Sequence, residues 1–333
     1  MRIAIGFNAD LPIREMVEYA SLVDVSEFDS FWIHEHSFGR DSVSFLGAAA
    51  QATRKVKLGV ACITPFARHP VTIAATTCTL QESSSGRLLV GIGTGFPMRL
   101  DLMGIKHEKP IGAIKDAIEI CRQMWTGNVV SYTGSVFSVK NVKSLTGACP
   151  RIPIYIAGWK PQMLELAGRL SDGYVAKGGE SIESTRQIVS SIKTSAESVG
   201  RQISEIDVAA YLLSLTDSSK QKALDRARKD PFVTYMLSVQ DDYLYEGTGI
   251  DPSKKKPIAE NYFKGNIAAA SSFVSDDMLE AFTLVGTEVD VIERVFDYKK
   301  AGVALPILQP ISMRKNDIAG IIAAGKNLIS QRK

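Results

Sequence analysis

The chain has 333 residues, of which 45% are hydrophobic and 23% are charged, and its net charge is +3. This composition is typical of a globular protein. The net charge is too small to indicate binding of nucleic acids or of an anionic membrane surface, so we expect neither as a partner. The length fits either two domains or one large α/β barrel.

The cysteines and the first residues of the chain indicate the cellular compartment of the protein. The four cysteines form no Cys-x-x-Cys pair; they are Cys62, Cys78, Cys121 and Cys149. Scattered cysteines of this kind predict free thiols in a reducing cytoplasm. Residues 1–4 run directly into a predicted strand, so we expect no signal peptide. No apolar run approaches the roughly 20 residues needed to span a bilayer.

Strands and helices alternate along the chain. The predicted strands are 2–7, 30–34, 55–62, 88–92, 153–157, 173–176, 206–215 and 304–309. The predicted helices are 11–27, 42–52, 69–85, 111–126, 161–170, 182–199, 218–240, 276–285, 288–300 and a last one at the C-terminal end. Alternation predicts a parallel sheet. Eight strand–helix units without a break in composition predict one domain over residues 1–333, a (β/α)8 TIM barrel, in preference to an open doubly wound sheet.

Two segments interrupt this rhythm. Residues 129–142 alternate Val, Tyr, Val, Phe and Val around Gly134, which predicts a β-hairpin inserted into the barrel. Residues 241–275 are a long stretch of mixed composition, predicted to be irregular, and a lid over the pocket is one interpretation of it. The run 254–256 is three lysines, which we interpret as a solvated surface, with phosphate binding as the alternative.

In (β/α)8 barrels the ligand binds at the carboxyl ends of the strands. The predicted strand ends therefore define the candidate site. They carry Asn8, Glu35-His36, Cys62-Ile63-Thr64, Gly93-Thr94-Gly95, Gly158-Trp159, Lys177-Gly178-Gly179 and Gln309.

Two of these strand ends are rich in glycine. Glycine accepts positive φ, so residues 93–95 permit a sharp turn that presents backbone N–H groups and the Thr94 hydroxyl at one point. Residues 177–179 are followed by Glu180-Ser181 at a predicted helix start. Backbone N–H groups at a helix start, with a lysine beside them, favour a phosphate group. Plain tight turns remain the alternative at both places.

Glu35 and His36 place a carboxylate beside an imidazole at one strand end, an arrangement suited to proton transfer. A structural His36 bonded to the backbone is the alternative. No pair of histidines has the spacing of a metal site, and a Gly-x-Ser-x-Gly elbow is absent. We therefore expect the chemistry to come from a bound cofactor that carries a phosphate, with no metal.

Five sequence motifs occur in order along the chain. They are residues 29–36 (DSFWIHEH), 64–70 (TPFARHP), 86–95 (GRLLVGIGTG), 153–158 with 163–168, and 285–287 with 301–303. In this order and spacing they resemble the luciferase-like barrel oxidoreductases, over nearly the whole chain. Residues 206–211 and 277–287 are most similar to the branch that depends on coenzyme F420, and especially to its methylenetetrahydromethanopterin reductases.

The resemblance implies an oxidoreductase that binds coenzyme F420, a deazaflavin on a phosphorylated tail, and moves a hydride between its carbon C5 and a small-molecule substrate such as a methylene-pterin. Glu35 and His36 would be catalytic and lie by the ring, and the Cys62–Ile63 bond would be a non-prolyl cis peptide behind it. The other implied cofactor contacts are Thr64, Gly93, Thr94, Gly95, Gly158, Lys177, Gly178 and Gly179. The implied substrate pocket is Asn8, Phe96, Trp159 and Tyr211. A cytoplasmic homodimer is implied as well.

The sequence departs from that branch at two positions. Strand one has Gly6 and the turn after strand four has Phe96, where the resemblance leads us to expect carboxylates. An apolar Phe96 would dry and narrow the pocket. Two alternatives therefore stay open: an FMN-dependent monooxygenase that needs oxygen and a partner reductase, and a non-catalytic protein that only binds the cofactor.

Overall fold

The computed structural model describes residues 1–331. The chain divides into two compact units. The N-terminal unit comprises residues 7–175 and 191–207, and the C-terminal unit comprises residues 1–6, 176–190 and the part from Val208 onward. Within the described residues, no helix combines the length and the apolar character that crossing a membrane requires.

The N-terminal unit is a parallel sheet with helices. Its strands pair in the order β2 (Ser30–His34), β3 (Lys57–Ile63), β4 (Leu88–Gly93), β7 (Ile154–Ala157) and β8 (Gly173–Ala176). Its helices are α1 (Ile13–Asp24), α2 (Ser42–Ala52), α3 (Pro70–Ser83), α4 (Pro97–Leu102), α5 (Pro110–Trp125) and α6 (Pro161–Leu170), with a 3-10 turn η1 (Ile203–Glu205). Helix α7 (Ile182–Glu197) belongs partly to each unit.

The C-terminal unit has a second set of parallel strands, in the order β10 (Leu284–Gly286), β9 (Asp207–Thr216), β11 (Leu305–Pro310) and β1 (Ala4–Phe7). Its helices are α8 (Lys220–Arg228), α9 (Pro231–Ser238), α10 (Lys255–Phe263), α11 (Ile267–Ser272), α12 (Asp276–Phe282), α13 (Glu288–Lys300) and α14 (Lys315–Ser330). Two 3-10 turns are η2 (Asp242–Tyr245) and η3 (Pro252–Lys254).

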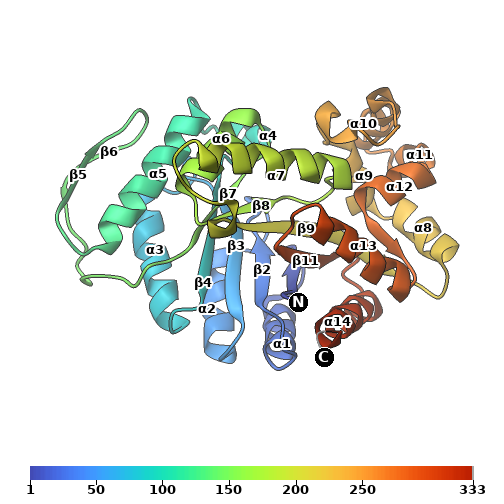
Figure 1. The fold of residues 1–333 in the computed structure, drawn as a ribbon, viewed down its shortest axis with the longest axis horizontal. Coiled ribbons are helices and arrows are strands. Elements are labelled where there is room, and N and C mark those ends of the chain that lie inside the picture. Colours follow the sequence, from blue (N-terminus) through green and yellow to red (C-terminus); the bar gives the residue numbers. More distant parts are fainter. Residues whose placement is uncertain (332–333) are drawn as a thin grey trace. The chain divides into compact units, whose positions relative to one another are not determined.

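The predicted fold class is confirmed. Strands β1, β2, β3, β4, β7, β8, β9 and β11 are the predicted barrel strands, each within a few residues of its expected bounds. Together the two units supply the alternating parallel strands and helices of a (β/α)8 barrel (Figure 1). Helix α4 and the short strand β10 were not predicted.

Close strand packing explains one glycine inside the sheet. Trp32 on β2 is fully buried, and its indole Nε1 donates a hydrogen bond of 2.9 Å to Ser30 Oγ. Gly59 is opposite Trp32 on β3. A Cβ at Gly59 would lie 2.6 Å from Trp32 Cε2. The sheet accepts the indole because position 59 has no side chain.

The predicted hairpin is present as β5 (Val130–Thr133) and β6 (Ser138–Val142), paired antiparallel (Figure 1). Asp116 on α5 holds it in place. Its carboxylate accepts hydrogen bonds from Tyr132 OH at 2.9 Å, Val136 N at 2.7 Å and Phe137 N at 3.0 Å. A buried carboxylate with this many donors fixes the hairpin to the helix.

The segment from 218 to 275 is more regular than the sequence predicts. Pro231 starts a new helix, so the single helix predicted over 218–240 is two helices, α8 and α9, because proline lacks the N–H that an unbroken helix needs. Beyond it, α10 and α11 replace the expected irregular stretch. These helices share a buried core that includes Leu224, Leu237, Leu244, Ile258 and Phe282. Figure 1 shows α8 to α12 gathered into one helical cluster.

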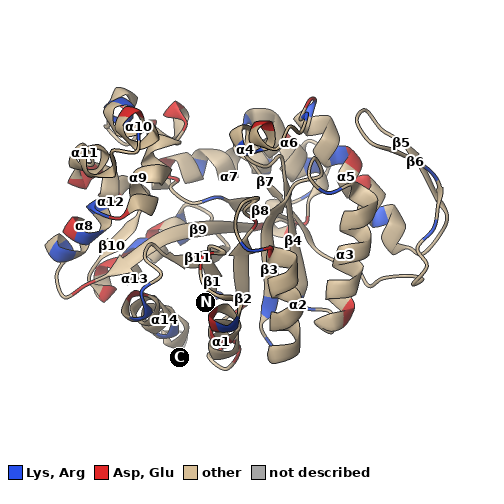
Figure 2. Ribbon diagram, turned by 180° about the vertical axis from the view of Figure 1, so that it is seen from behind, with Lys and Arg blue, Asp and Glu red and all other residues tan. Residues whose placement is uncertain are grey.

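The charged residues are mixed on the outer helices. Figure 2 shows basic and acidic positions interspersed on α8, α10 and α13. Lys300 on α13, for example, pairs with Asp297 of the same helix at 3.3 Å. The net charge is only +3 because 39 Lys and Arg residues are nearly balanced by 36 Asp and Glu residues.

Candidate functional site

Glu35 is fixed at the carboxyl end of β2. Its N–H donates to Ala61 O at 3.1 Å, which continues the pairing with β3 one residue past the strand. The hydroxyl of Ser42, the first residue of α2, donates to Glu35 Oε2. Ser42 is fully buried. The carboxylate is thus oriented by a neighbour that cannot turn away, as a positioned acid or base requires.

Cys62 lies at the carboxyl end of β3, against β4. The structure has a non-prolyl cis peptide bond between Ala61 and Cys62. The prediction of a cis bond at Cys62–Ile63 is therefore wrong by one residue. The register of β3 against β4 shifts between Val60 and Ile63, so the irregular backbone begins before Cys62.

Cys62 is half-buried, and desolvation of its thiol raises the pKa of that thiol to about 12, with the nearby Glu35 carboxylate adding to the effect. It packs on Gly93, where a Cβ would fall well inside the van der Waals radius of Cys62 Sγ. A thiol with so high a pKa stays protonated at neutral pH, and here it serves as an apolar wall rather than a nucleophile.

Thr64 and the 93–95 turn are joined directly. Thr64 Oγ1 donates to Thr94 O at 3.0 Å. Gly95 has a φ of +74°, and a Cβ there would lie 3.2 Å from the Thr64 side chain. The predicted sharp turn is therefore present, and it needs glycine at position 95 both for its backbone conformation and for space.

His36 follows Glu35 and is half-buried. Its Nδ1 accepts a hydrogen bond of 3.2 Å from Phe38 N. Burial lowers the His36 pKa, and the Arg99 guanidinium lowers it further. Arg99 lies on α4, and its guanidinium carbon is 5.5 Å from the centre of the Phe96 ring. Phe96 therefore holds a cation near His36, a role that the sequence did not reveal.

We expect the imidazole of His36 to be neutral at pH 7. Because its pKa in the folded protein is below the ordinary 6.5, the stability that this group contributes is complete above pH 6.5 and is lost as the pH falls through the lowered pKa. Replacement Arg99→Gln should move the pKa back toward 6.5. An NMR titration of the imidazole C–H signals measures this, and an unchanged midpoint in Arg99→Gln would show that Arg99 does not act on His36.

The remaining predicted residues of the N-terminal unit lie at strand ends as expected. Asn8 follows β1, and Gly158 and Trp159 follow β7; all three are half-buried. Gly158 has a φ of +144°, and a Cβ there would lie 2.7 Å from Met163 Cγ. The β4 and β7 ends are adjacent, since a Cβ at Gly93 would lie 3.2 Å from Ala157 O.

The glycine turn, residues 177–179, belongs to the C-terminal unit. Gly178 and Gly179 have φ values of +100° and +83°. Glu180 is buried, and its own carboxylate accepts the Gly178 N–H at 2.9 Å. Burial raises the pKa of Glu180 and lowers that of Lys177, while the two opposite charges counteract both shifts. One N–H that the sequence assigns to a phosphate is thus already bonded within the chain.

Gln240, which the sequence analysis missed, holds the glycine turn from the other side. Its Nε2 donates to Gly179 O at 2.7 Å, and its Oε1 is buried without a hydrogen-bond partner in the described residues. Lys255 donates to Gln240 O and pairs with Asp242. Lys255 therefore holds the segment around Gln240 in place, whereas the sequence predicted that all three lysines of the run are solvated.

Ser181 caps the helix that follows the turn. Its Oγ accepts the Ser184 N–H at 3.1 Å and donates to Leu244 O at 3.3 Å. This serine therefore connects the start of α7 to the helical cluster. Serine is a common capping residue at a helix start, so the cap could be predicted from the sequence. The hydrogen bond from Ser181 to Leu244 O could not, because no sequence pattern links these two positions.

Tyr211 on β9 lies over Gly6 on β1. A Cβ at Gly6 would lie inside the van der Waals radius of the Tyr211 ring and 2.7 Å from Ile307 Cγ2. The tyrosine is buried. The space that a side chain at position 6 would fill is thus taken by Tyr211 and Ile307, which gives the unusual Gly6 a steric reason.

Within the described residues no cluster of His, Cys, Asp and Glu side chains is arranged to hold a metal ion. All four cysteines are free thiols. What the strand ends offer instead is a glycine-lined backbone surface, one oriented carboxylate, a neutral imidazole and, in the C-terminal unit, a glycine turn with a lysine. Such groups suit a protein that binds a flat cofactor and moves hydrides or protons rather than a hydrolase.

The chain belongs to the luciferase-like monooxygenase family, whose model matches residues 2–305. It is 31% identical over 331 residues to a 5,10-methylenetetrahydromethanopterin reductase of Methanolobus tindarius, covering 99% of this chain and 100% of the relative. It is 32% identical over 341 residues to the reductase of the same name from Archaeoglobus fulgidus, with 100% of both chains covered.

Comparison with solved structures finds enzymes of the same kind. The coenzyme F420 dependent tetrahydromethanopterin reductase of Methanopyrus kandleri superposes with a TM-score of 0.91 at 27% identity, over 100% of both chains. An F420-dependent secondary alcohol dehydrogenase superposes with a TM-score of 0.80 at 20% identity, again over 100% of both chains. The second likeness concerns the fold alone. The first extends the family assignment to the whole length of the chain.

Proposed function

We propose that the protein is a coenzyme F420-dependent oxidoreductase that reduces 5,10-methylenetetrahydromethanopterin or a related pterin. The observation that carries this proposal is the similarity to methylenetetrahydromethanopterin reductases along the entire length of both chains. A match over whole chains includes every strand end, so it bears on the site as well as on the fold.

The residues present fit a deazaflavin with a phosphorylated tail. At the β3 and β4 ends, Gly93 and Gly95 leave backbone without side chains, which suits close approach of a flat ring. Beside the glycine turn, the unpaired Oε1 of Gln240 calls for a hydroxyl or N–H donor. Lys177 supplies a positive charge for a phosphate.

The coenzyme, when bound, supplies the carbon that accepts or donates the hydride. The chain supplies the remaining functions. Glu35, oriented by Ser42, holds or moves a proton, and His36 in its neutral form can accept one. Phe96 and Trp159 exclude water from the reacting atoms, and Asn8 and Tyr211 line the substrate side.

The cofactor contacts in this proposal divide into two sets. Ring contacts come from Cys62, Ile63, Thr64 and Gly158, and tail contacts come from Gly93-Thr94-Gly95 and Lys177-Gly178-Gly179. Thr64 and Thr94 are already bonded to each other, so this part of the surface is organised before any ligand binds. Pre-organisation of this kind reduces the entropy lost on binding.

A binding titration tests the proposal. The fluorescence of oxidised F420 is followed as protein is added, with FMN titrated in parallel. We expect a Kd of about 1 μM or tighter for F420 and much weaker binding of FMN. Lys177→Met should weaken F420 binding by about tenfold or more, while Lys254→Met, at an exposed lysine, should not. Failure to bind F420 would overturn the proposal.

An FMN-dependent monooxygenase is the second candidate, since the matched family is named for luciferase-like monooxygenases. Tight FMN binding with weak F420 binding would favour it. Turnover then distinguishes the chemistry: the reductase consumes reduced F420 and methylenetetrahydromethanopterin without oxygen, whereas a monooxygenase consumes oxygen.

We also propose a homodimer in the cytoplasm, with residues 1–333 acting as one domain. Four free thiols agree with a reducing compartment. Light scattering after gel filtration measures the oligomeric state directly. A mass of one chain at micromolar concentration would contradict the dimer.

A further inference from the structure

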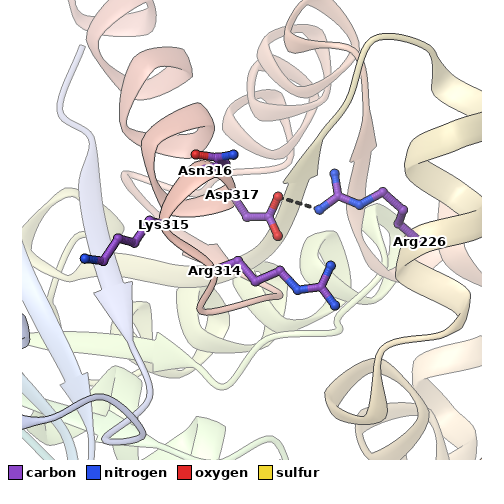
Figure 3. Close-up of a pocket in the computed structure, with 5 residues that line it drawn as sticks. All are labelled: Arg226, Arg314, Lys315, Asn316 and Asp317. Carbon is purple, nitrogen blue, oxygen red and sulfur yellow. Dashed lines mark hydrogen bonds and ion pairs between the residues drawn. The ribbon is translucent and has the colours of Figure 1, made fainter.

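A pocket of about 410 Å³ in the C-terminal unit lies outside the residues discussed so far (Figure 3). It is lined by Arg226, Arg314, Lys315, Asn316 and Asp317. Arg226 comes from α8, and the others form the first turn of α14 and its N-cap position. The two helices follow β9 and β11, which are parallel neighbours with Pro310 opposite Ser214. The pocket therefore lies on the carboxyl side of these strands.

Arg226 is fully engaged by carboxylates. It donates to Asp217 at 2.7 Å and to Asp317 at 2.5 Å. These hydrogen bonds hold the pKa of Asp217 below its usual range and raise that of Arg226. Arg226 therefore fixes one wall of the pocket and contributes little net positive charge to a ligand.

Arg314 is different. Within the described residues its guanidinium makes no hydrogen bond and no ion pair, and its charge acts on the carboxylate of Asp230 only through space. Asp230 already accepts from Phe232 N at 2.9 Å, where it caps α9. Figure 3 shows the Arg314 guanidinium pointing into the same space as that of Arg226, while Lys315 extends away. One uncommitted cation thus faces the pocket.

The start of α14 adds to the attraction for an anion. The helix has 16 residues, and no side chain caps its N-terminus. Its first N–H groups and the positive end of its dipole are therefore available to a negatively charged ligand.

Asp317 makes the site selective. Its side chain is only 6% exposed; Oδ1 accepts from Arg226, and Oδ2 is buried with no hydrogen-bond partner in the described residues. Figure 3 shows this second oxygen directed toward the space between the two guanidinium groups. A carboxylate oxygen can only accept, so a ligand here must bring its own O–H or N–H donor.

We propose that this pocket binds hydrogen phosphate, either as the free ion or as the phosphate of a small hydroxylated metabolite. The ionised oxygens accept from Arg314 and from the start of α14, and the P–OH, or a neighbouring hydroxyl, donates to Asp317 Oδ2. Sulfate has the same shape and charge but carries no proton at neutral pH, so Asp317 repels it. This site does not depend on the cofactor proposed above.

Calorimetric titration of the full chain at pH 7 with inorganic phosphate, sulfate and glycerol 3-phosphate tests this proposal. We expect phosphate to bind with a Kd of about 1 mM or tighter, and sulfate to bind about tenfold more weakly or worse. Tighter binding of glycerol 3-phosphate than of phosphate would identify a metabolite as the ligand, and weaker binding would identify the free ion; both keep the site.

Three variants locate the binding. Arg314→Gln, at an exposed residue that should not affect folding, is expected to weaken phosphate binding about tenfold or more. Asp317→Asn should abolish the preference for phosphate over sulfate, because an amide can donate to either ion. Lys326→Gln, at an exposed lysine near the other end of the same helix, is the matched control and should change nothing.

The glycine turn is another possible phosphate site, so the titrations are repeated in Lys177→Met. The effect of Arg314→Gln should persist there. Equal binding of phosphate and sulfate by the unaltered protein would overturn the proposal, as would Arg314→Gln binding phosphate normally. Because Asp317 is paired with Arg226, melting curves must show that Asp317→Asn is folded, and Arg314→Gln decides the question if it is not.

Discussion

Alanine at Gly93 is expected to abolish F420 binding in a protein that still folds. The added Cβ would overlap Cys62 Sγ and would lie 3.2 Å from Ala157 O. The neighbours are the Ala157 backbone and the Cys62 thiol at the end of β3, so neither can move aside without shifting a strand end. We expect the free energy of unfolding to fall by about 1–3 kcal/mol, as for other overpacked cores, and F420 affinity to fall by more than about a hundredfold.

Denaturant unfolding and the F420 fluorescence titration measure the two effects of Gly93→Ala. The double variant Gly93→Ala with Cys62→Ala removes the overlapping sulfur, so it should recover part of both losses. Gly47→Ala on α2 is the matched control, since a Cβ there comes no closer than 4.0 Å to Leu80. Normal F420 binding by Gly93→Ala would mean that the β4 end does not contact the cofactor.

Glutamine at Glu35 should leave F420 bound but nearly stop the reaction. The amide keeps the size of the carboxylate but cannot take up a proton at neutral pH. Loss of a positioned acid or base lowers kcat by about 10²- to 10⁴-fold. Steady-state oxidation of reduced F420 with methylenetetrahydromethanopterin measures kcat, and the fluorescence titration should give a Kd within about threefold of the unaltered protein.

Two further variants test whether the loss of activity is specific to the Glu35 carboxylate. Ser42→Ala leaves the Glu35 carboxylate in place but removes its hydrogen bond, so a smaller loss of kcat is expected. Glu246→Gln, at an exposed position, should have no effect. If Glu35→Gln kept a normal kcat, the proton would have to be handled elsewhere, with His36 as the next residue to replace.

The barrel was predictable because each strand carries its own signal. A short apolar run such as 88–92, flanked by glycines, favours a buried strand, and the structure places β4 at Leu88–Gly93. The strand ends follow from the strands, which is why Glu35, Cys62 and the 93–95 turn were found. The starts of helices that begin with proline, such as Pro161 of α6, could be predicted in the same way.

The features that could not be predicted from the sequence depend on contacts between residues that are distant along the chain. Gln240 is 61 positions from Gly179, and nothing in its neighbourhood marks it as the partner of a glycine turn. Arg99 could have been suspected, since Pro97 signals a short helix directly after the 93–95 turn. The cis bond before Cys62 lies within the register shift of β3 against β4, and no local sequence pattern encodes that pairing.

The packing of Tyr211 on Gly6 has a consequence for how this sequence can change over time. A side chain at position 6 is incompatible with the present Tyr211 and Ile307, so a mutation that introduces a carboxylate there is harmful while both remain. A smaller residue at 211 has to arise first. A single substitution at position 6 should therefore destabilise the protein, whereas the same substitution paired with a smaller residue at position 211 should be tolerated.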